Sequence, residues 1–176
     1  MARLRILISL VLAFTLTGAA AAQHLVKKND AIEAWIAHLD SDRPFLLLDV
    51  GAGELRLQHG SALLRTCTLE ALQVDESTPV TQHLLSRARR YAAEPFQSIT
   101  AGPFDWEQYL VREANDDCLL QFSGGLLVHA DPSLRSLYAA RVTATDLRAL
   151  FDAVGDSTDI VLLPAGWDQA DSDSRQ

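Results

Sequence analysis

The sequence contains few of the residues from which metal and cofactor sites are built. It has two cysteines, Cys67 and Cys118, and no Cys-x-x-Cys pair. Its five histidines lack the helical or hairpin spacing of metal ligands. They are His24, His38, His59, His83 and His129. The chain also lacks a glycine-rich phosphate loop and a Gly-x-Ser-x-Gly motif, so we expect neither a metal site nor a cofactor.

Basic residues are in the minority as well. The chain has 15 Lys and Arg against 23 Asp and Glu, a formal net charge of -8. A surface of this sign repels nucleic acid and anionic lipid headgroups. We therefore expect no nucleic-acid partner.

Residues 1–22 have the pattern of a secretory signal peptide. Arg3 and Arg5 precede an apolar run from Ile6 to Leu16, and the small residues Ala19–Ala22 follow. The run is shorter than the roughly 20 apolar residues that a membrane-spanning helix needs. We expect cleavage after Ala22, a periplasmic or secreted protein, and no stable membrane insertion afterwards.

The two cysteines permit two interpretations. An exported chain with an even number of cysteines is a candidate for a disulfide, here between Cys67 and Cys118. Both residues lie in apolar, strand-like segments, so two separately buried thiols would fit equally well. The sequence leaves both possibilities open.

The first half of the remaining chain predicts a helix and a β-meander. Residues 23–44 contain an amphipathic helix with Asn29 or Asp30 as its N-cap, and Pro44 ends it. Strands follow over residues 45–50, around 55–57 and through Cys67, separated by turns at residues 51–53 and 59–60. Apolar residues between Thr78 and Tyr91 recur at helical spacing, which predicts a second helix there.

The second half alternates between strands and one helix. Residues 100–111 are predicted to form a turn that leads into either an edge strand or a short helix. Strands are predicted over Cys118–Phe122 and Leu126–His129, joined by a turn at Gly124-Gly125. A helix with Thr143 or Thr145 as its N-cap ends at Gly155, and a strand covers Asp159–Leu163.

These elements predict one mostly β domain over residues 45–166. It would have a mixed sheet or sandwich with a few packed helices, preceded by the N-terminal helix. Residues 167–176 are polar and are predicted to be a disordered tail. The role of the segment 78–106, a candidate lid, is left open.

Residues 45–163 resemble the catalytic domain of the L,D-transpeptidases of the YkuD type. The segment "LLLDVGAGELRLQHGSALLRT" is similar to the first hairpins of that family. The family then has a histidine at the end of a strand, a loop, and Ser-His-Gly-Cys-x-Arg before a capped helix and a last strand. Here "LLVHA" supplies His129, and "SLYAARV" supplies Ser136 and Arg141 at the matching spacing.

The departures from the family pattern fall on the chemistry. The motif's histidine corresponds to Leu137, its glycine to Tyr138 and its nucleophilic cysteine to Ala139. The family's reaction needs a thiolate that attacks a carbonyl, and a methyl group cannot do this. The resemblance therefore implies a catalytically inactive relative with a remnant cleft at His129, Ser136, Ala139 and Arg141.

Three functions remain possible at this stage. The first is a secreted envelope protein, a pseudoenzyme that binds the peptidoglycan stem peptide or an envelope protein, with Arg141 contacting a carboxylate. The second is an active transpeptidase or carboxypeptidase whose nucleophile has moved to Cys118 or Ser136. The third is an unrelated small structural protein of the envelope.

Overall fold

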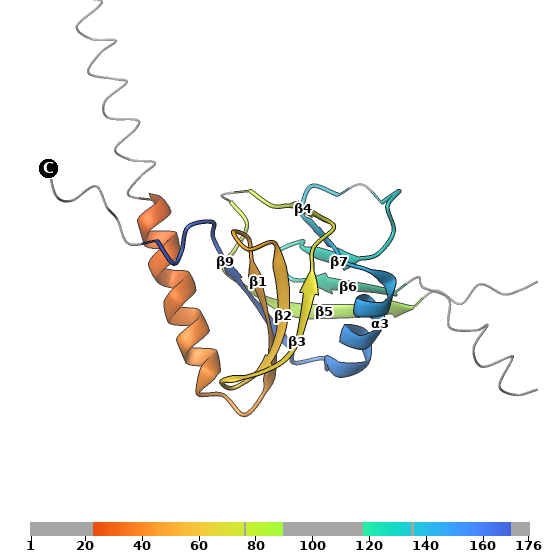
Figure 1. The fold of residues 1–176 in the computed structure, drawn as a ribbon, viewed down its shortest axis with the longest axis horizontal. Helices are drawn as coiled ribbons and strands as arrows, with labels where there is room; N and C mark the ends of the chain where they lie inside the picture. Colours follow the sequence, from red (N-terminus) through yellow and green to blue (C-terminus); the bar gives the residue numbers. More distant parts are fainter. Residues whose placement is uncertain (1–22, 76, 90–117, 135, 170–176) are drawn as a thin grey trace, which may run out of the picture.

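A computed structural model describes residues 23–75, 77–89, 118–134 and 136–169 (Figure 1). The predicted signal peptide and the segment 100–111 lie outside these ranges, as does most of the candidate lid. Within the described part, no helix is both long and apolar enough to span a bilayer.

In the described residues, nine strands form one mixed sheet in the order β3-β2-β1-β9-β5-β6-β7-β8-β4. Two pairs, β1 with β9 and β7 with β8, are parallel. The expected mostly β fold with a mixed sheet and packed helices is confirmed. The elements are β1 (Pro44–Asp49), β2 (Glu54–His59), β3 (Ala62–Thr68), β4 (Ala71–Gln73), β5 (Thr81–Arg89), β6 (Cys118–Phe122), β7 (Leu127–His129), β8 (Ala139–Arg141), α3 (Ala144–Ala153) and β9 (Asp159–Leu163).

The central strands β1 and β9 are buried on both faces. Leu46 and Leu48 of β1 face the larger hydrophobic core, whereas Phe45 and Leu47 face the N-terminal helix. The residues of β9 alternate in the same way. Double burial explains why both strands are continuous apolar runs in the sequence.

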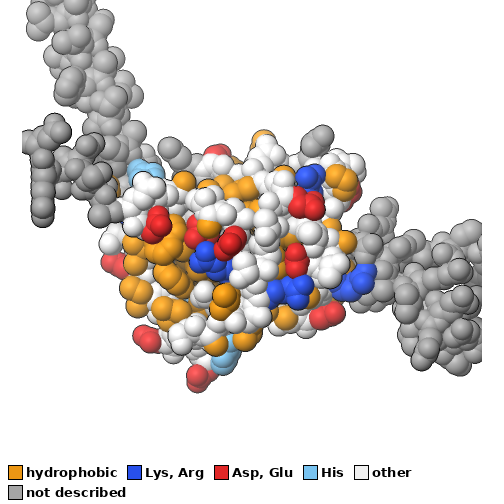
Figure 2. Space-filling view, in the orientation of Figure 1, with side chains coloured by type: hydrophobic (Ala, Val, Ile, Leu, Met, Phe, Trp, Pro, Cys, Tyr) orange, Lys and Arg blue, Asp and Glu red, His pale blue; other side chains and the backbone are white. Residues whose placement is uncertain are grey.

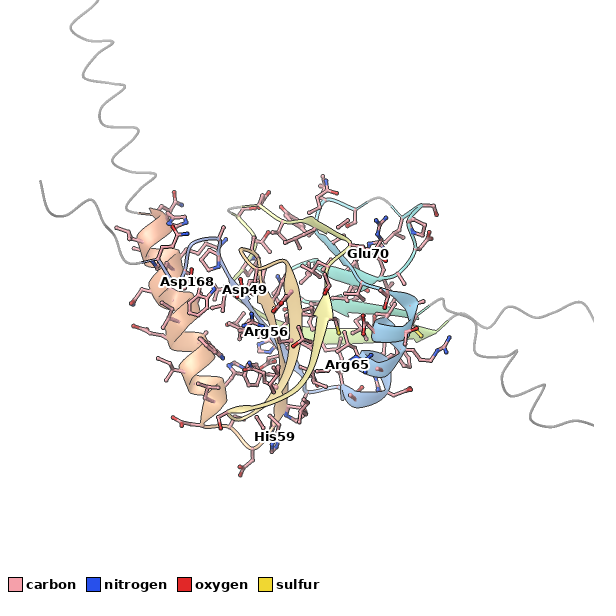
Figure 3. The ribbon with its side chains drawn as sticks, in the orientation of Figure 1. Asp49, Arg56, His59, Arg65, Glu70 and Asp168 are labelled. Carbon is pink, nitrogen blue, oxygen red and sulfur yellow. The ribbon has the colours of Figure 1, made fainter. Side chains whose placement is uncertain are left out.

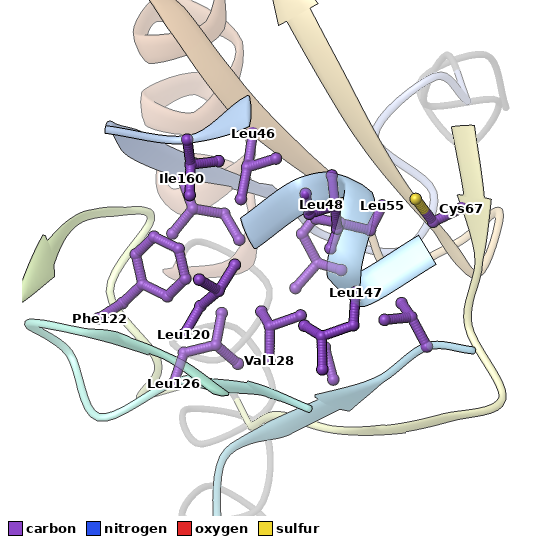
Figure 4. Close-up of a cluster of buried hydrophobic side chains, with 14 of the residues drawn as sticks. Leu46, Leu48, Leu55, Cys67, Leu120, Phe122, Leu126, Val128, Leu147 and Ile160 are labelled. Carbon is purple, nitrogen blue, oxygen red and sulfur yellow. The ribbon is translucent and has the colours of Figure 1, made fainter. Parts of the chain in front are cut away.

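The larger core lies between the two halves of the curled sheet (Figure 4). Leu46 and Leu55 come from one half, Leu120 and Val128 from the other, and Leu147 reaches in from α3. The long strand β5 joins the halves, since it pairs with β9 at one end and with β6 at the other. Side chains from distant parts of the chain are therefore needed to complete this core.

The helix α3 is fixed at its N-terminus by a side-chain cap. Of the two candidate caps, Thr143 is the one used, and its Oγ1 accepts from Asp146 N at 3.1 Å. Such a cap contributes about 1 kcal/mol to stability. Arg65 Nη2 of β3 also donates to Asp146 Oδ1 at 2.7 Å, which ties α3 to the neighbouring strand.

Acidic and basic side chains are interspersed over the face of the molecule that Figure 2 shows.

The prediction of a helix between Thr78 and Tyr91 is wrong, because residues 81–89 form β5. Burial alternates along its first residues: Gln82 and Leu84 are buried, and His83 and Leu85 are exposed. This period of two is that of a strand. The helical spacing of the apolar residues was overridden by pairing with β9 and β6.

The N-terminal helix, orange in Figure 1, covers one face of β1 and β9. It is helical over residues 23–39, so Asn29 and Asp30 lie inside it and neither is its N-cap. It also ends earlier than the predicted residue 44, because Pro44 already begins β1. Trp35 Nε1 donates to Gln58 Oε1 at 3.1 Å, which fixes the helix to β2.

The start of the predicted disordered tail is ordered instead. The Trp167 ring packs edge-on against Trp35, with ring centroids 5.4 Å apart, and its Nε1 donates to Asp49 Oδ2 at 3.1 Å. Lys28 Nζ donates to Gln169 O at 2.6 Å. A partly buried aromatic contact and two hydrogen bonds thus hold residues 167–169 in place, while residues 170–176 lie outside the described part.

The two cysteines do not form a disulfide in the structure. Cys67 of β3 and Cys118 of β6 are both buried in the larger core. The structure therefore agrees with two separately buried thiols, one of the two interpretations that the sequence leaves open.

Candidate functional site

A pocket of about 180 Å³ lies where β4, β7 and β8 meet the loop between β7 and β8. It brings together His129, Ser136, Ala139 and Arg141, the four residues of the predicted remnant cleft. The remaining lining residues were not expected from the sequence, because the short strand β4 carries no clear periodic signal. They are Ala71, Leu72, Gln73 and Leu134.

The parallel pairing of β7 and β8 positions the polar side chains of the pocket. His129 and Arg141 are direct partners in the register, and Val142 N donates to His129 O at 3.0 Å. Their neighbours Val128 and Ala140 point into the larger core. Because strand side chains alternate between faces, His129 and Arg141 lie together on the opposite face, toward the pocket.

His129 is almost fully enclosed, and one of its ring nitrogens is unsatisfied. The residue is 5% exposed, and its Nδ1 is buried without a hydrogen-bond partner. Burial lowers the pKa of His129, and the charge of Arg141 acts in the same direction, against opposing contributions from Asp131. The imidazole is therefore neutral at neutral pH, when it offers one donor and one acceptor nitrogen.

Arg141 is paired with Glu70, a residue that the sequence did not predict as part of the site. Glu70 is labelled in Figure 3. Arg141 Nε lies 3.2 Å from Glu70 Oε2, but the contact lacks hydrogen-bond geometry, so the buried Nε–H is not satisfied. Glu70 N donates to Arg141 O at 2.8 Å, which fixes the backbone of Glu70 beside the pocket. Glu70 could be placed only after β4 was known to pair with β8.

The Ser136 hydroxyl is hydrogen-bonded within its own loop. It does not bond to His129 Nδ1, the nitrogen that could act as its base. The hydroxyl donates to Tyr138 O at 3.2 Å. The Tyr138 hydroxyl in turn donates to Asp75 Oδ2 at 3.3 Å, which links this loop to the turn after β4. Hydrogen bonds from Ser77, its hydroxyl foremost, lower the pKa of Asp75. The nucleophile-to-base hydrogen bond that an activated serine requires is not formed at Nδ1.

Neither cysteine reaches the pocket. Leu119 is the register partner of His129, so its neighbour Cys118 points to the other face of the sheet, into the larger core. Burial raises the pKa of the Cys67 thiol to about 11, which keeps it protonated. A thiol in either position is therefore poorly suited to attack a ligand in the pocket.

A second pocket, of about 240 Å³, lies at the end of the N-terminal helix. Two of its polar side chains, His38 and Asp159, are bonded to each other. His38 Nδ1 is 2.7 Å from Ala34 O, and His38 Nε2 is 3.1 Å from Asp159 Oδ2. His83 Nδ1 contacts the other oxygen of Asp159. These contacts fasten the helix to β9 and β5, and we interpret the cluster as structural.

A cluster of three or more His, Cys, Asp or Glu side chains that could hold a metal ion is not found among the residues that the structure describes.

Comparisons with known proteins give structural likeness only. No family model matches the sequence, and no curated protein matches it. Among solved structures, the chain is similar to L,D-transpeptidase 1 of Mycobacterium tuberculosis, with a TM-score of 0.45 and 16% identity over 69% of this chain and 62% of that one. An L,D-transpeptidase of Stackebrandtia nassauensis has a TM-score of 0.46 and 10% identity, over 69% and 56% of the two chains.

A third similar structure is the L,D-transpeptidase of Mycobacterium smegmatis. Its TM-score is 0.44 and its identity 13%, over 68% of this chain and 58% of that one. The chain thus spans 56% to 62% of the length of these three proteins.

Proposed function

We propose that this chain is a periplasmic or secreted envelope protein that binds a peptide in the pocket of His129 and Arg141 without transforming it. The peptide is the stem peptide of peptidoglycan or a segment of an envelope protein. The observation that carries the proposal is the pair of buried, unsatisfied nitrogens, His129 Nδ1 and Arg141 Nε, on adjacent strands of one pocket. Such atoms cost stability unless a partner satisfies them, and a bound ligand would do so.

The non-catalytic part of the proposal depends on Ala139. This residue occupies the position of the nucleophilic cysteine in the sequence pattern that the chain resembles, and it lines the same pocket as His129. A reaction through an acyl-enzyme requires a nucleophile at such a point. The described pocket lining contains one hydroxyl, that of Ser136, which is bonded to Tyr138 O.

Restoring the thiol tests this interpretation. We expect Ala139→Cys to form a covalent adduct with a carbapenem, measured by intact-mass spectrometry, because His129 lines the same pocket and can take the thiol proton. The unmodified chain should form no adduct. Ala71→Cys is the matched control, since it places a thiol in the same pocket on the edge strand β4.

Two results would contradict the proposal. An adduct on the unmodified chain, mapped to Ser136 or Cys118, would make it an enzyme. Equal labelling of Ala139→Cys and Ala71→Cys would mean that position 139 has no special relation to His129. Binding itself is measured separately, by titrating the chain with a stem tetrapeptide and comparing Arg141→Gln.

A further inference from the structure

Among the residues that the structure describes, the charges around the pocket sum to neutral or slightly negative. Glu70 neutralises Arg141 at 3.2 Å, and burial keeps His129 uncharged at neutral pH. Asp131 adds a carboxylate near His129, close enough for its charge to act on the imidazole. An entering carboxylate would therefore meet Arg141 already paired and would be repelled by Glu70.

The unsatisfied atoms are also poorly matched to a carboxylate. Arg141 Nε–H is a donor only, whereas His129 Nδ1 in the neutral ring accepts or donates according to its tautomer. A carboxylate offers acceptors only, so it satisfies one of the two tautomers. An amide offers a carbonyl oxygen and an N–H, and it can satisfy Arg141 together with either tautomer.

We propose that the pocket selects a neutral amide over a carboxylate, and that Glu70 is the residue that sets this preference. The geometry behind the proposal is the juxtaposition of Glu70, Arg141 and His129 on three adjacent strand ends. Gln73, which also lines the pocket, offers a further amide with both a donor and an acceptor. This inference rests on the proposed function, because it names the chemical class that the binding pocket accepts.

The test compares two probes that differ only at one group. N-acetyl-Ala-Ala as the free acid and as the carboxamide are titrated into the full chain at pH 7 and low salt, followed by NMR. We expect the chain to bind the carboxamide more tightly. In Glu70→Gln, Arg141 loses its competing partner, and the preference should move toward the acid by about fivefold, as for a partly exposed ion pair.

Glu54→Gln is the matched control. Glu54 also pairs with an arginine, at 2.8 Å from Arg56 Nη2, but it lies on β2 and does not line the pocket. This variant should keep the carboxamide preference of the unmodified chain. A shift as large as that in Glu70→Gln would mean that overall charge, rather than the contact with Arg141, sets the preference, and it would overturn the inference.

The remaining outcomes separate the inference from the proposed function. If both probes bind and the acid binds more tightly, or if Glu70→Gln leaves the ratio unchanged, the amide selection is wrong while peptide binding stands. If neither probe binds to the unmodified chain or to Glu70→Gln, the proposed function fails and the inference fails with it.

Discussion

His38 and His129 each line a pocket, but their ring nitrogens have different surroundings. Both nitrogens of His38 face an oxygen, Ala34 O at 2.7 Å and Asp159 Oδ2 at 3.1 Å. Nδ1 of His129 is buried and has no partner. The histidine of the larger pocket therefore already has a partner at each ring nitrogen, whereas the histidine of the smaller pocket has bonding capacity left for a ligand. Bonding state is a better guide here than volume.

The largest expected effect comes from breaking the satisfied cluster. Asp159→Ala removes the carboxylate that contacts both His38 and His83, and we expect the free energy of unfolding to fall by about 1–3 kcal/mol. Denaturant unfolding measures the change. Asp156→Ala is the control, because that side chain is 96% exposed, and its effect should stay within about 0.5 kcal/mol. Equal losses in the two variants would show that the Asp159 cluster is not a structural fastening.

A smaller change in the free energy of unfolding, of opposite sign, is expected when His129 is replaced. His129→Leu replaces a buried ring with an unsatisfied nitrogen by an apolar side chain, so the free energy of unfolding should stay the same or rise, by up to about 1 kcal/mol. His38→Leu, measured alongside, should be destabilising because it removes satisfied hydrogen bonds. The contrast between the two histidines would disappear if His129→Leu lost as much stability as His38→Leu.

The smallest effect concerns pH. Burial lowers the pKa of folded His129 below the 6.5 of an unperturbed histidine. Between those two pKa values the unfolded chain binds more protons than the folded one, so stability falls as the pH falls through that interval. His129→Leu should show a shallower loss of stability than the unmodified chain as the pH is lowered from 7.5 to 5.5. Parallel curves would mean that His129 does not titrate differently in the folded state.

Local patterns in the sequence were enough to predict several of the strands and helices. The meander of β1, β2 and β3, the hairpin of β6 and β7, and the capped helix α3 lie close to their predicted positions. Gly125 has a φ of 86°, a left-handed conformation that suits the glycine turn predicted there. These elements depend on contacts between neighbours in the chain, which periodicity and turn residues reveal.

Elements that depend on distant partners were missed or misread. β5 has an apolar spacing that also fits a helix, and only its pairing with β9 and β6 makes it a strand. The short strands β4 and β8 form because they pair with each other. The residues of the candidate site differ in the same way. The motif predicted His129 and Arg141, but Gln73 lines the pocket through β4, and Glu70, which pairs with Arg141, directly precedes that strand.

The parallel pairing of β1 with β9 has a consequence for how the chain acquires its structure. The first strand pairs with its neighbour β2 on one side, but its partner on the other side is the last strand, so the centre of the sheet cannot close before residues 159–163 have been synthesised. Pairing between such distant segments makes folding slow and leaves apolar strands exposed in the meantime. Until Asp159–Leu163 has been synthesised, the leucines of β1 lack part of their final cover, and an apolar segment exposed in this way is prone to aggregation.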